Sequence, residues 1–183
     1  MDASARQGHY LPHYVYDDYV QWEGRWELIS GIAHAMTPAP SIEHQLISQR
    51  IAQQLGLLLE GCDRCHALLP VDWKVAEDTV LQPDNLVVCY EPVGPYLTKA
   101  PSLIFEIVSR KSHVRDVEIK FAIYEREGVK YYCLVFPEEG LVKVFVLRGG
   151  RYSKLADVTN EKIEFDLVAA CRFSFDFGLI WGA

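Results

Sequence analysis

Two acidic residues occupy places where an unpaired charge would be costly. Glu106 lies at the centre of the apolar run LIFEIVS, and Asp84 precedes the apolar segment NLVVCY. A buried carboxylate is unfavourable unless it is paired, hydrogen-bonded or bound to a metal ion. If the two segments are neighbouring strands, as consecutive strands commonly are, Asp84 and Glu106 lie side by side. Adjacent carboxylates suit Mg²⁺ or Mn²⁺, with water and phosphate as further ligands; salt-bridged structural acids are the alternative.

Positive charge is concentrated directly after the Glu106 segment. The stretch SRKSHVR contributes Arg110, Lys111 and Arg115 to a chain whose net charge is −7. Such side chains could hold a phosphodiester backbone over a metal site. A solvated loop that offsets nearby acids is the alternative.

Lys120 lies beside an apolar stripe of a predicted helix, formed by Val117, Phe121 and Tyr124. Its side chain has three possible orientations. It could extend outward to solvent, pair with Asp116 one turn earlier, or point across the sheet toward the two carboxylates. In the third orientation its ammonium group could stabilise charge that develops on a phosphate, or orient a water molecule.

The cysteines include the spacing Cys62-Asp-Arg-Cys65-His66, which matches a haem attachment pattern and offers three zinc ligands. No second Cys/His pair follows at zinc-finger spacing, and the N-terminus lacks the apolar core of an export signal. We therefore expect two thiols at a turn between a helix and a strand, and no disulfide framework. A zinc or redox site is the alternative.

Bulk composition is that of a soluble globular protein, with 50% hydrophobic and 23% charged residues. Because no run of 18 apolar residues occurs, we expect a cytoplasmic protein with no membrane partner. The acidic balance argues against a general nucleic-acid binder but does not exclude a local basic groove.

Hydrophobic spacing indicates the elements that must position these residues. RWELISGIAHAM predicts a hairpin about Ser30-Gly31, and apolar residues at helical spacing predict a helix from a Ser41 cap to about Leu59. Further strands are predicted over 67–76, 85–90, 103–109, 130–136, 141–147 and 151–158, and a helix over 114–127 that ends at Gly128.

This order predicts an α+β (α/β-like) fold with a central mixed β-sheet flanked by helices and an N-terminal β-hairpin. At 183 residues we expect one domain, with a core over about 14–155 and an aromatic tail, 156–183, that packs on the body.

Taken together, the motifs are similar to those of the Uma-type (Uma-two) restriction endonucleases of the PD-(D/E)XK nuclease superfamily. The resemblance covers about residues 14–155. Its parts are WELISG (26–31), SIEH (41–44), QPD (82–84), EIVS (106–109), Asp116 with Lys120 and Tyr124, and GVKYY (128–132) leading to Pro137.

The resemblance implies a restriction-endonuclease-like core and Mg²⁺-dependent hydrolysis of DNA phosphodiester bonds. Asp84 and Glu106 match the two acids that bind Mg²⁺ or Mn²⁺ and act in catalysis. Glu27 and His44 match positions that complete the metal site. For Glu27 a cross-strand ion pair is the alternative, and for His44 a structural role.

The lysine usually found two residues after the second acid is replaced by Val108. The resemblance implies that Lys120 supplies this catalytic group, and that Arg110, Lys111 and Arg115 follow the DNA backbone. We expect double-stranded DNA as the substrate and a homodimer, because cutting both strands commonly requires two active sites.

Two other functions remain open at this point. A catalytically silent nuclease fold could serve as a binding or interaction module, which the loss of lysine at Val108 and the acidic balance favour. A zinc or redox protein would use Cys62, Cys65 and His66.

Overall fold

The computed structural model describes residues 12–36, 39–109, 115–169 and 171–182, and its centre is a six-stranded mixed sheet. The strand order is β10-β9-β8-β7-β6-β3. β7 and β8 are parallel, and the other neighbours are antiparallel. The strands are β3 (His66–Leu68), β6 (Asn85–Val88), β7 (Leu103–Ile107), β8 (Tyr131–Phe136), β9 (Leu141–Arg148) and β10 (Arg151–Val158).

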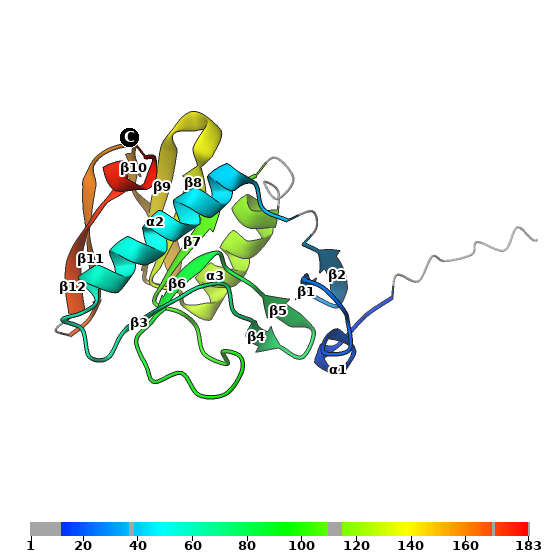
Figure 1. Cartoon of the computed structure of the whole chain (residues 1–183). Coiled ribbons are helices and arrows are strands. Elements are labelled where there is room, and N and C mark those ends of the chain that lie inside the picture. Colours follow the sequence, from blue (N-terminus) through cyan, green and yellow to red (C-terminus); the bar gives the residue numbers. More distant parts are fainter. Residues whose placement is uncertain (1–11, 37–38, 110–114, 170, 183) are drawn as a thin grey trace, which may run out of the picture.

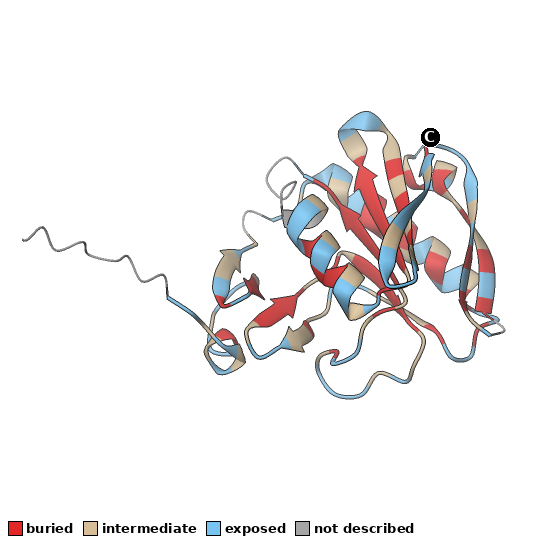
Figure 2. Ribbon diagram, turned by 180° about the vertical axis from the view of Figure 1, so that it is seen from behind, coloured by how far each residue is buried: buried red, intermediate tan, exposed pale blue. Residues whose placement is uncertain are grey.

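A helix covers each face of this sheet (Figure 1). α2 (Ile42–Leu58) lies over one face, and α3 (Phe121–Glu127) lies over the other. Side chains alternate along a strand, so Phe105 of β7 packs in the core beneath α2, whereas Ile104 packs beneath α3. The central strands are buried (Figure 2), which explains their continuous apolar sequences. The predicted α+β fold with helices on both faces is confirmed.

A smaller sheet extends from one side of the central sheet (Figure 1). Its order is β2-β1-β5-β4, and the short helix α1 (Tyr16–Tyr19) packs on β1. β1 and β2 form the predicted hairpin, which turns at Ser30 and Gly31, both with positive φ. The strands are β1 (Trp26–Ile29), β2 (Ile32–Ala35), β4 (Trp73–Ala76) and β5 (Thr79–Leu81).

The aromatic tail packs on the body as predicted. It forms the hairpin of β11 (Lys162–Val168) and β12 (Cys171–Asp176), followed by the 3-10 turn η3 (Phe177–Ile180). Phe165, Phe173, Phe175 and Phe177 are buried in the core beneath α2. The Gln54 side chain of α2 bonds both the backbone amide and the carbonyl of Asp176, at 2.6 and 3.0 Å.

Two predicted elements differ from the structure. The single strand expected over 67–76 is divided between β3 and β4, which belong to different sheets; Pro70 lies between them and has no amide hydrogen to donate. The helix expected over 114–127 begins as a π-helix, η1 (Arg115–Lys120), and continues as α3. It ends at Gly128 in the left-handed region, as predicted. A 3-10 turn, η2 (Pro137–Glu139), joins β8 to β9.

The expectation of no disulfide framework was wrong. Cys62 is bonded to Cys171, and Cys65 is bonded to Cys89, while Cys133 is a buried free thiol. In the antiparallel β3–β6 register His66 lies opposite Val88. Cys65, which precedes His66, therefore lies opposite Cys89, which follows Val88. The spacing of the cysteines along the chain does not indicate which of them lie next to each other in the fold.

The two disulfides also argue against a zinc site at Cys62, Cys65 and His66. As disulfides, Cys62 and Cys65 offer no thiolates to a metal. His66 lies instead 3.5 Å from the Glu91 carboxylate. The structure does not bring these three side chains together as ligands.

Among the described helices, none has the length and apolarity needed to cross a membrane.

Candidate functional site

Asp84 and Glu106 lie on adjacent strands, as their segments predicted. The β6–β7 register pairs Asn85 with Phe105, so Asp84 comes opposite Glu106 at the next position. The Asp84 Oδ2 atom accepts a hydrogen bond of 2.8 Å from the backbone amide of Ile107. Asp84 is partly exposed at the rim, whereas Glu106 is 2% exposed. The pair therefore connects the surface with the interior of the sheet.

His44 comes to this rim on the first turn of α2. Ser41 caps the helix, and its hydroxyl accepts from the His44 amide at 3.2 Å. The His44 Nε2 atom then lies 3.1 Å from Asp84 Oδ2, the oxygen already bonded to Ile107. Both contacts converge on one oxygen, so the imidazole orients the Asp84 carboxylate and leaves Oδ1 to face other ligands.

Lys120 adopts the third of its predicted orientations. It is 2% exposed, and its Nζ atom lies 2.9 Å from Glu106 Oε1 and 2.8 Å from Glu27 Oε1. Glu27 comes from β1 of the smaller sheet, so this ammonium group joins the two sheets electrostatically. The pairing explains why Glu106 is tolerated inside an apolar strand. The two carboxylates and one ammonium constitute the buried charge cluster of the site.

Two further groups hold the buried charge cluster in place. The Tyr124 hydroxyl donates to Glu106 Oε1 at 2.6 Å, and the backbone amide of Gln82 donates to Glu27 Oε1 at 2.9 Å. Tyr124 is fully buried, and its ring stacks on Trp73 with centroids 5.8 Å apart. No role in the site was predicted from the sequence for Tyr124 or Gln82. The signal for Tyr124 was its spacing, four residues after Lys120 on the same helical face.

Removing the Tyr124 hydroxyl should weaken the fold measurably. We expect Tyr124→Phe to lower the free energy of unfolding by about 1.5–3 kcal/mol, because the lost bond is to a charged acceptor. Urea denaturation measures this change. Tyr152→Phe is a matched control, since the Tyr152 hydroxyl donates to the neutral carbonyl of Val129 at 2.9 Å. We expect about 0.5–1.5 kcal/mol there; equal losses in both would contradict a charged acceptor at Glu106.

The oxygen atoms of Asp84 and Glu106 are donors that a hard divalent cation prefers. Within the described ranges, no three His, Cys, Asp or Glu side chains are grouped to hold a metal ion together. Magnesium is commonly held by one or two carboxylates, with waters and a substrate phosphate as its other ligands. The two cross-strand acids fit that limited donor set.

The predicted contacts to the DNA backbone are not tested by the structure. Arg110 and Lys111 lie outside the described residues. Arg115 is the first residue of η1, and its side chain is not among those described. Their role stays a prediction.

Comparison with known proteins gives two matches. Residues 16–175 match the Uma2 family model, described as "putative restriction endonuclease". The fold is similar to the crystal structure of a "putative nuclease belonging to DUF820" from Anabaena variabilis, with a TM-score of 0.73 and 14% sequence identity, over 91% of this chain and 97% of that one. At this identity the likeness concerns the fold, and it confirms the predicted nuclease-like core. No curated protein matches the sequence.

Proposed function

Because this chain belongs to the Uma2 family, we propose that it is an endonuclease that hydrolyses phosphodiester bonds of double-stranded DNA with Mg²⁺ or Mn²⁺. The observation that carries the proposal is the pairing of Asp84 with Glu106 across β6 and β7, with a buried lysine on the second acid. Acidic metal ligands and a nearby cation are groups that metal-assisted phosphodiester hydrolysis can use.

In this proposal Asp84 and Glu106 hold the metal ion. When bound, the metal lowers the pKa of a coordinated water and neutralises charge on the scissile phosphate. His44 fixes the rotamer of the Asp84 carboxylate through its Nε2 contact. Tyr124 and Lys120 both bond Glu106 Oε1 and so fix the second acid.

Lys120 has a second role in the proposal. Its ammonium group lies inside the protein, where a positive charge acts on a developing phosphate charge through little water. Glu27 holds this group from the opposite side, so the lysine is fixed between two carboxylates. We place Arg110, Lys111 and Arg115 along the DNA backbone, where they would supply local positive charge in a chain whose net charge is −7.

A catalytically silent binding module is the second candidate, and Val108 at the usual lysine position is the observation that favours it. The contact between Lys120 and Glu106 weakens that argument, because it returns an ammonium group to the second acid. The cytoplasmic location stays a prediction; the two disulfides weigh against it, since cytosolic reductants keep most thiols reduced.

The metal requirement provides the test. We expect purified protein to convert supercoiled plasmid to the open circle in Mg²⁺ or Mn²⁺, and to leave it intact in EDTA. Calorimetry with Mn²⁺ alone should show a binding heat without any DNA. Cleavage that persists in EDTA would contradict metal dependence. A folded protein that neither binds Mn²⁺ nor cuts plasmid would be the silent module instead.

A further inference from the structure

The outer face of α2 lacks the charges that normally keep a solvent-facing helix soluble. Over its 17 residues the helix carries only Glu43 and Arg50 as charged side chains, and Arg50 donates to the Ile180 carbonyl at 3.2 Å. Large apolar side chains stand exposed on the same helix: Ile42 is 81% exposed, Leu46 43% and Leu57 62%. Exposed apolar groups gathered on one element commonly mark an interaction surface.

Five of the exposed residues of α2 recur at the spacing by which one helix packs against another. Positions 42, 46, 49, 53 and 56 are all exposed and follow a 4-3-4-3 repeat, the seam of a helix pair. We call this set the α2 seam; its members are Ile42, Leu46, Gln49, Gln53 and Gly56. Gly56 at one end permits close approach of a second backbone.

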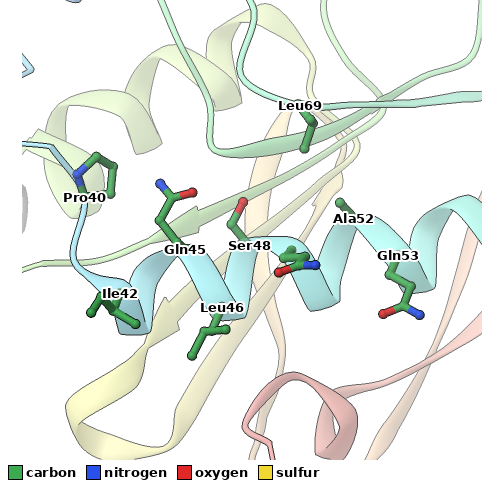
Figure 3. Close-up of a pocket in the computed structure, with 9 residues that line it drawn as sticks. Pro40, Ile42, Gln45, Leu46, Ser48, Ala52, Gln53 and Leu69 are labelled. Atoms are coloured by element: carbon green, nitrogen blue, oxygen red, sulfur yellow. The ribbon is translucent and has the colours of Figure 1, made fainter.

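A cavity of about 580 Å³ runs along one side of the α2 seam. Figure 3 shows Gln45, Ser48 and Ala52 on the side of the helix where Leu69 stands. Leu69 is itself 61% exposed. The helix therefore presents both a ridge and an adjoining hollow, which is the surface shape that receives side chains of a packed helix.

We infer that the α2 seam packs against the α2 seam of a second copy of this chain, antiparallel about a two-fold axis near Gln49 and Gln53. About that axis Gln49 of one copy lies opposite Gln53 of the other, and these two can pair because an amide side chain both donates and accepts. The seam carries no charge, so no like charges oppose each other. A DNA strand is a poorer occupant, because no Lys or Arg is among the described residues that line the cavity.

This dimer would relate the two candidate sites. His44 lies on the first turn of α2, and antiparallel pairing about residues 49–53 sets the two copies of His44 on the order of 20 Å apart along the helix axes, at 1.5 Å per residue. Both strands of one duplex could then be served by one dimer. That consequence rests on the proposed nuclease function, whereas the dimer does not.

Sedimentation of the whole chain tests the inference without DNA. We expect a wild-type dimer, and a dissociation constant at least about 100-fold higher in the double variant Gln49→Glu/Gln53→Glu, because it opposes like charges across the axis. Val93→Glu is the control, since it adds the same charge at a position 83% exposed in a distant loop. Circular dichroism would show that all three proteins are folded.

A second variant makes the contact specific. An equimolar mixture of Gln49→Cys and Gln53→Cys should form a disulfide-linked dimer on mild oxidation, and Val93→Cys should not. A wild-type monomer at about 0.1 mM would overturn the inference, as would a dimer that the double variant leaves intact. If all three proteins are monomers and the double variant alone loses DNA affinity, the surface binds DNA instead. Failure of plasmid nicking with an intact dimer would overturn the nuclease proposal and leave this inference standing.

Discussion

Replacing Asp84 by asparagine should reduce metal-dependent plasmid nicking by at least about 1,000-fold, because a metal-ligand charge is removed from the site. The substitution keeps the size of the side chain. Its amide oxygen can still accept the hydrogen bond from Ile107 that the carboxylate accepts at 2.8 Å. We therefore expect a folded protein, and Mn²⁺ binding measured by calorimetry should weaken in parallel with activity.

Asp176→Asn is the matched control for this experiment. The Asp176 carboxylate also accepts a backbone amide, from Gly178 at 3.0 Å, but it caps η3 in the C-terminal hairpin region. We expect nicking at the wild-type rate there. Wild-type nicking by Asp84→Asn would show that Asp84 is not a metal ligand, or that the activity belongs to a contaminant. The wild type could bind Mn²⁺ without nicking plasmid. If Asp84→Asn then lost that Mn²⁺ binding, the metal site would stand and the catalytic role would not.

The juxtaposition of Asp84 and Glu106 could be predicted because it depends on local rules. A single polar residue in an apolar run identifies Glu106, and a proline before Asp84 indicates the entrance of a strand. Consecutive strands commonly pair, and the β6–β7 register does set the two acids opposite each other. The same rules predicted the β1–β2 hairpin and helix α2.

The partners of Glu106 could not be predicted to the same extent, because they depend on packing across elements. Three orientations of Lys120 satisfied the helical pattern equally well, and only tertiary structure brings Glu27 from another sheet to its ammonium group. The π-helical turn that ends at Lys120 has no signature in hydrophobic spacing. The Cys62–Cys171 bond joins residues 109 positions apart, which sequence spacing cannot indicate.

Under the proposed function, the buried charge cluster makes stability and activity depend on the same lysine. Two carboxylates and one ammonium group that have lost water are maintained only by their mutual contacts and by donors such as Tyr124 and the Gln82 amide. A buried ion cluster is weak evidence for stability, since apolar residues of similar volume often stabilise a core as well or better. The chemical role proposed above for Lys120 would account for its burial.

Replacing Lys120 by methionine should therefore lower the free energy of unfolding by about 3–5 kcal/mol, because Glu27 and Glu106 lose their buried cation. Urea denaturation of both proteins under the same conditions measures the difference.

Two further variants separate charge from packing at this position. Lys154→Met removes an exposed lysine that contacts Asp157 at 2.8 Å, and we expect a change of no more than about 1 kcal/mol. The triple variant Glu27→Gln/Glu106→Gln/Lys120→Met removes all three charges and should recover most of the stability that Lys120→Met loses. It should remain inactive in plasmid nicking, because both proposed roles of the cluster are gone. Recovered stability without activity would assign the cluster to chemistry, whereas an unstable triple variant would show that the charges themselves hold the two sheets together.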